Sequence, residues 1–96
     1  MSDKIEVGNV NQPGHIARVD AVKYAAAKTA LLAILSEQEQ GLTQTEMMAA
    51  IKVQIDQTLF PNGAKSGWWI KTVQLDLEAK GQINRIATKP LRWTLA

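Results

Sequence analysis

Few side chains in this sequence of 96 residues have the types and spacing that chemistry requires. The one histidine, His15, follows Gly14 in a stretch without helical or strand periodicity, where a solvated loop residue is far more common than a base or metal ligand. No cysteine is present, which excludes thiolate metal sites and cysteine nucleophiles. Asp76 and Glu78 lie two positions apart in a predicted helix, so they diverge and do not form a catalytic pair.

The run Gly63-Ala64-Lys65-Ser66 resembles the end of a phosphate-binding loop. It lacks the glycine that such a loop carries before Gly63, and no predicted strand precedes it. We therefore predict no catalytic residue, no metal site and no cofactor, and a protein that is not an enzyme.

The remaining candidates are binding residues in the last third of the chain. The formal charge of +2 permits a nucleic-acid partner without demanding one. The candidate DNA contacts are polar or basic residues of a predicted third helix and of the hairpin after it: Lys65, Ser66, Lys71, Thr72, Arg85, Lys89 and Arg92. Asp76 and Glu78 lie at the margins of the outward side of that helix and reduce its local charge to +1.

A second pair of candidates indicates a protein partner. Trp68 and Trp69 are adjacent, so one of the two indoles must point away from the core side of the helix. Trp68 falls on the outward side together with Leu75, and an outward Trp beside a Leu is typical of a protein interface or a homodimer. The alternative is that the hairpin or the N-terminal segment covers Trp68.

Composition indicates one small globular domain. Hydrophobic residues make up 46% of the chain and charged residues 21%, a globular balance, and the length allows a single core. The longest apolar stretch, Ala21 to Leu35, is interrupted by Lys23 and Lys28 and resembles neither a membrane span nor a secretory signal. We expect no membrane association and a cytoplasmic protein.

Two helices are predicted in the first two thirds of the chain. Asp20 is a plausible N-cap for a helix that runs to about Glu39. Its core side carries Tyr24, Ala27, Leu31, Ile34 and Leu35. After Gly41, Thr43 and Glu46 have the spacing of a capping box and predict a second helix, which the break at residues 60–63 ends.

The last third predicts a helix and a hairpin. Ser66 is a good N-cap for a third helix that runs to Lys80 before Gly81, and its core face carries Trp69, Ile70, Val73 and Leu77. Residues 82–87 and 91–95 follow as two strands, the second alternating apolar and polar side chains.

The first eighteen residues lack a sustained period and predict a flexible N-terminal arm. Ile5 and Val7 alternate like a short strand, which leaves open that the arm docks on a sheet edge or on another copy of the chain.

The order of elements over residues 20–96 resembles the winged helix-turn-helix superfamily. Leu77, Gly81 and Ile83 match the pattern that ends the recognition helix and enters the wing in that superfamily. "GWWIKTVQLDLEAKGQI" and "PLRW", with "GHIARVDAVKY" upstream, also resemble a family of short, functionally uncharacterised bacterial proteins. Many family members carry Leu at the position of Gln74, so here Val73 and Trp69 must supply the packing.

The resemblance implies an α+β fold, a winged helix-turn-helix of three helices followed by a two-stranded β-hairpin wing. Residues 1–18 would form the arm and residues 19–96 the winged-helix domain. The function that it implies is DNA binding or a role in transcription, with double-stranded DNA in contact with the third helix and wing. The alternative is a protein-interaction or homodimerisation module. An exposed Trp68 favours the protein-interaction module, and a covered Trp68 favours DNA binding.

Overall fold

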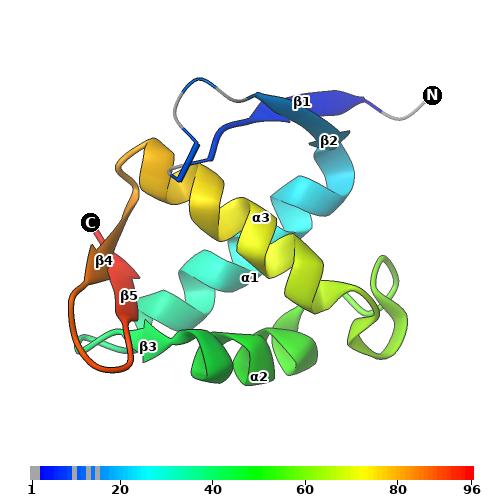
Figure 1. Ribbon diagram of the computed structural model, residues 1–96. Coiled ribbons are helices and arrows are strands. Elements are labelled where there is room, and N and C mark those ends of the chain that lie inside the picture. Colours follow the sequence, from blue (N-terminus) through cyan, green and yellow to red (C-terminus); the bar gives the residue numbers. More distant parts are fainter. Residues whose placement is uncertain (1–2, 10, 13, 15) are drawn as a thin grey trace.

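The computed structural model describes residues 3–9, 11–12, 14 and 16–96 and places three helices around one core (Figure 1). The helices are α1 (Ala21–Ser36), α2 (Gln44–Gln54) and α3 (Ser66–Ala79), and a short 3₁₀ helix, η1 (Pro61–Gly63), precedes α3. The five residues predicted for the core side of α1 are all buried, as are Trp69, Ile70, Val73 and Leu77 on α3. The predicted core faces of both helices are therefore confirmed.

Two small antiparallel sheets complete the fold. Strands β4 (Ile83–Ile86) and β5 (Arg92–Leu95) form the predicted hairpin, and β3 (Leu42–Thr43) joins it beside β5, in the order β3-β5-β4. We did not predict β3, which is too short to have a period of its own. Trp93 is buried against the helices, whereas Leu91 and Leu95 stay 39% exposed at the two ends of the alternating segment.

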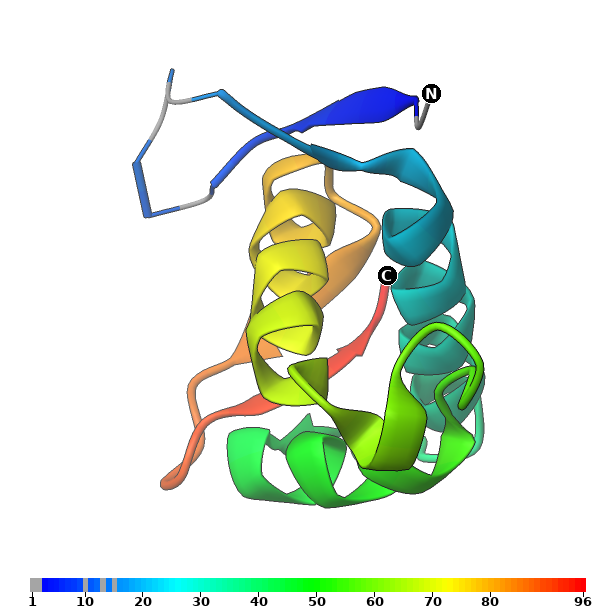
Figure 2. The same cartoon turned by 90° about the vertical axis from the view of Figure 1, so that its right-hand side faces the viewer.

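The second sheet overlaps the predicted arm and extends two residues beyond it. Strands β1 (Lys4–Val7) and β2 (Ala17–Asp20) pair antiparallel, so residues 4–7 and 17–18 differ from the flexible arm that we expected. Burial explains the difference, because Val7 and Val19 both join the core. Figure 2 shows this hairpin lying across α1 and α3 at one end of the molecule.

Two predicted helix ends are corrected. The first helix ends at Ser36 instead of Glu39, because residues 37–40 are polar and exposed and Gly41 turns the chain at φ 81°. The third helix begins after Lys65, whose left-handed backbone (φ 60°) turns the chain into α3. Ser66 is therefore the first helical residue, and it does not cap the helix with its side chain.

Gln74 occupies the core position for which the resemblance predicts Leu. Its side chain is 2% exposed, and its amide oxygen has no hydrogen-bond partner within the described residues. The neighbouring Val73 and Trp69 are buried and supply the packing, as expected.

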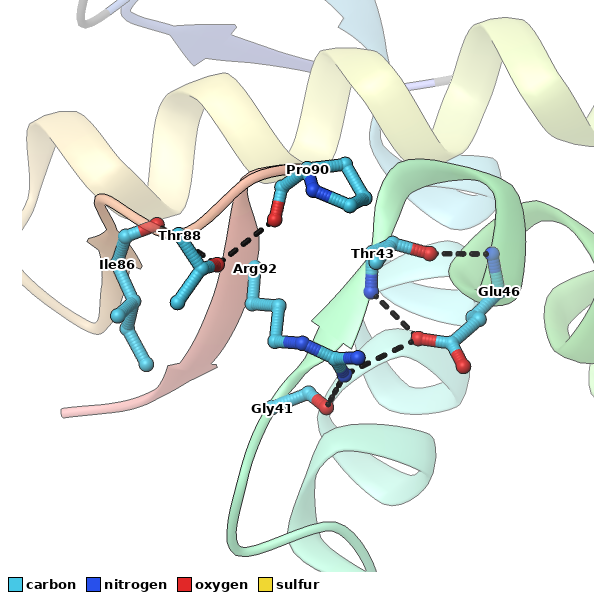
Figure 3. Close-up of polar contacts among 7 residues, drawn as sticks. All are labelled: Gly41, Thr43, Glu46, Ile86, Thr88, Pro90 and Arg92. Carbon is cyan, nitrogen blue, oxygen red and sulfur yellow. Dashed lines mark hydrogen bonds and ion pairs between the residues drawn. The ribbon is translucent and has the colours of Figure 1, made fainter.

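The capping box predicted for α2 is confirmed, and the β4–β5 hairpin, called the wing below for brevity, extends it (Figure 3). The Thr43 hydroxyl accepts the Glu46 N–H at 3.2 Å, and the Glu46 carboxylate accepts the Thr43 N–H at 2.9 Å. The guanidinium of Arg92 on β5 lies 3.3 Å from the same carboxylate and donates to the Gly41 carbonyl at 3.1 Å. The Thr43 N–H contributes most to lowering the pKa of Glu46, and the Arg92 charge adds to it.

We expect Glu46→Gln to lower the free energy of unfolding at neutral pH and to have little effect in strong acid. Because the pKa of Glu46 is lowered, its ionised form stabilises the fold above the ordinary value of 4.5, and that stabilisation is lost as the pH falls through the lowered pKa. Glutamine can keep the hydrogen bond to Thr43 but loses the charge that faces Arg92. Urea titrations at both pH values measure the effect, and an equal loss at both would contradict this explanation.

Candidate binding face of helix α3

The outward side of α3 and the N-terminal hairpin together enclose a groove of about 280 Å³. Trp68, Lys71, Thr72 and Leu75 line it from the helix. The opposite wall comes from β1, β2 and the residues next to them, namely Val7, Gly8, Asn9, Ala17 and Val19. Apart from the alternation of Ile5 and Val7, no sequence pattern indicates this wall.

The two adjacent tryptophans divide as predicted between core and surface. Trp69 is 7% exposed and packs edge-on against Phe60, with ring centroids 6.1 Å apart. Trp68 is 57% exposed, and its ring meets that of Trp69 edge-on at 5.0 Å. Among the described residues, neither the wing nor the N-terminal hairpin covers Trp68, so a large part of the indole faces solvent at the edge of the groove.

A buried carboxylate holds the hairpin wall against the helix. Asp76 is fully buried, and its Oδ1 accepts the Gly8 N–H at 2.8 Å. Its Oδ2 accepts the hydroxyl of Tyr24 on α1 and the ammonium of Lys80 at 2.8 Å. Burial, reinforced by the bond to Asp76, raises the pKa of Tyr24, so the phenol stays protonated as a donor. Asp76 therefore lies inside the fold and not at the outward margin, where the sequence placed it.

Glu78 has a similar role on the side of the wing. Its carboxylate accepts the Trp93 indole N–H at 2.6 Å and pairs with Arg85 at 3.2 Å, and its side chain is 6% exposed. The Arg85 guanidinium also lies over the Trp93 ring, 5.6 Å from its centroid. The two acids that we counted against the charge of the outward surface are thus both engaged by internal donors.

The predicted DNA-contacting residues separate into three groups. Arg85 and Arg92 on the wing pair with Glu78 and Glu46. Ser66 is 5% exposed, and Thr72 is half-buried in the groove lining. The exposed side chains that form no salt bridge within the described part of the chain are Lys65, Lys71 and Lys89.

His15 lies outside the described residues. Across residues 3–9, 11–12, 14 and 16–96, the acidic side chains form no group that could hold a metal ion. No helix of that part is long and apolar enough to cross a membrane.

These features define an α+β domain of three helices and two small antiparallel sheets, with a half-open groove along its third helix. The sequence model of a family of unknown function, DUF6958, matches residues 4–93, and the chain belongs to that family. No curated protein and no solved structure matches this chain.

We expect Tyr24→Phe to lower the free energy of unfolding by about 1.5–3 kcal/mol, because it removes a buried hydrogen bond to a carboxylate. Lys80→Met removes the cationic partner of the same buried carboxylate, so we expect it to lower the free energy of unfolding too. Urea denaturation measures both variants. If Tyr24→Phe cost less than about 1 kcal/mol, the phenol would not make the buried bond to Asp76 described here.

Proposed function

We propose that this protein is a winged-helix domain that binds a segment of another protein along the outward side of α3. The winged-helix assignment rests on the order β3-α2-α3-β4-β5, with β3 beside β5, and on the position of α3 directly before the wing. The fold alone does not decide between nucleic acid and protein as the partner.

The exposure of Trp68 carries the choice of a protein partner. A large aromatic side chain that is 57% exposed beside an apolar groove is an energetic anchor for protein binding, and the domain does not use it to close its own core. Leu75 lies two turns further along the same helix and lines the same groove. Together they give the face an apolar centre.

The wing favours the same choice. Its two arginines, Arg85 and Arg92, are held by carboxylates of the domain itself, and a DNA phosphate would have to compete with Glu78 and Glu46 for them. Of the three basic residues that we predicted to contact DNA from the wing, Lys89 is therefore the one that is exposed and forms no salt bridge in the described chain.

A phage-displayed library of random peptides selected on the full chain tests this proposal. We expect the enriched peptides to compete for one site and to lose about tenfold or more in affinity on Trp68→Ala, because hot-spot aromatic residues dominate such sites. Val53→Ala is the matched control, since Val53 is an apolar residue of α2 that is 80% exposed and does not line the groove. Peptides that bind Trp68→Ala as well as the wild type would overturn the proposal.

DNA binding is the second candidate, and the exposed lysines favour it. Lys65 and Lys71 lie at the start and on the outward side of α3, and Lys52 of α2 lines a pocket together with Lys65 and the first residues of α3. The side chain of the N-cap residue Lys65 makes no hydrogen bond to the free amides of that helix end, where a phosphate is favoured.

If the lysines bind DNA, Lys65→Glu/Lys71→Glu should lower the affinity for a mixed-sequence duplex by about tenfold or more at low salt. Lys23→Glu/Lys28→Glu on α1 makes the same change in net charge away from this surface and is the control. Fluorescence anisotropy of a labelled duplex measures both. Equal effects of the two double variants, or no binding by the wild type, would exclude α3 as a DNA-reading helix.

A further inference from the structure

The residues that line the groove indicate which kind of protein segment binds there. Most of its residues are apolar or contribute backbone, and the one ionisable side chain among them is Lys71. The volume of about 280 Å³ is below the roughly 300–1,000 Å³ that is typical of small-molecule pockets. A space of this size suits one or two apolar side chains of a partner segment.

The two acids of α3 do not neutralise Lys71. Asp76 is fully buried and accepts from Gly8, Tyr24 and Lys80. Glu78 accepts from Trp93 and pairs with Arg85. Within the described part of the chain, Lys71 is exposed and no carboxylate lies within salt-bridge distance of it. The rim of the groove therefore carries a positive charge without an internal counter-ion.

Helical spacing places this charge between the two apolar anchors. Trp68, Lys71 and Leu75 follow one another at intervals of three and four residues, so they form one row along α3. An indole, an ammonium group and an isobutyl group in a row complement an apolar side chain with a carboxylate close beside it.

A second copy of the chain fits this surface less well. In a two-fold symmetric dimer formed through the same face, the two copies of Lys71 would approach each other across the axis without an acid between them. Charge complementarity therefore favours a different protein as the occupant.

We infer that the groove binds an acidic segment of a partner protein, with an apolar side chain inserted between α3 and the N-terminal hairpin and a carboxylate paired with Lys71. This inference rests on the proposed function and adds the chemistry of the partner.

Charge reversal combined with peptide selection tests the inference. Random peptides displayed on phage are selected in parallel on the wild type and on Lys71→Glu. We expect the wild type to enrich peptides with Asp or Glu next to an apolar residue, and Lys71→Glu to enrich Lys or Arg in that place. Replacing the acid of a wild-type-selected peptide by its amide should weaken binding to the wild type about tenfold and binding to Lys71→Met much less. Lys28→Glu is the control and should select as the wild type does.

The outcomes separate the inference from the proposed function. Peptides that depend on Trp68 but carry no acidic preference, or whose preference survives Lys71→Glu, would overturn the acidic partner and leave the protein-binding face in place. The absence of any peptide that depends on Trp68 would overturn both. Dimers that form at increasing concentration and dissociate in Trp68→Ala, measured by sedimentation, would replace the acidic partner by a second copy.

Discussion

The packing of this domain depends on one buried carboxylate. A charge removed from water is tolerated only when hydrogen bonds or opposite charges replace its hydration, and Asp76 obtains them from three separate parts of the chain. The donors are a backbone amide just after β1, a phenol on α1 and the ammonium group of Lys80, the residue that follows the last turn of α3. The bonds from Gly8 and Tyr24 place the end of β1 and helix α1 relative to the third helix.

This arrangement links the stability of the domain to the shape of its surface. The hairpin of β1 and β2 forms one wall of the groove, and the bond from Gly8 to Asp76 fixes the end of β1 against α3. On the other side of the helix, Glu78 fixes the wing through Trp93 and Arg85. The outward face of α3 is therefore held between two small sheets by two acids that belong to the helix itself.

Local patterns predicted the helices well. The capping box of Thr43 and Glu46, the turn at Gly41 and the apolar faces of α1 and α3 depend on residues near one another in sequence, and the structure contains all of them. The predicted start of α3 is wrong by one residue. A left-handed backbone is uncommon for lysine, and no sequence pattern predicts it at Lys65.

Features that depend on residues far apart in the sequence were harder to predict from it. Asp76 and Gly8 are 68 residues apart, and without the fold Asp76 looks like an ordinary surface acid of an amphipathic helix. The pairing of β1 with β2 and the addition of β3 to β5 likewise depend on partners that a short window does not contain. The exposure of Trp68 was one of two explicit alternatives, and only the packing of the hairpin and wing around α3 could decide it.

The edge-on contact of Trp68 and Trp69 also has an optical consequence. Two indoles whose centroids are 5.0 Å apart couple their electronic transitions, and the coupling depends steeply on their distance and mutual angle. Trp69 is fixed in the core, whereas Trp68 borders the groove, so a change at the surface alters the geometry of the pair from one side. The circular dichroism of this pair is thus an intrinsic spectroscopic reporter of the groove that requires no added label.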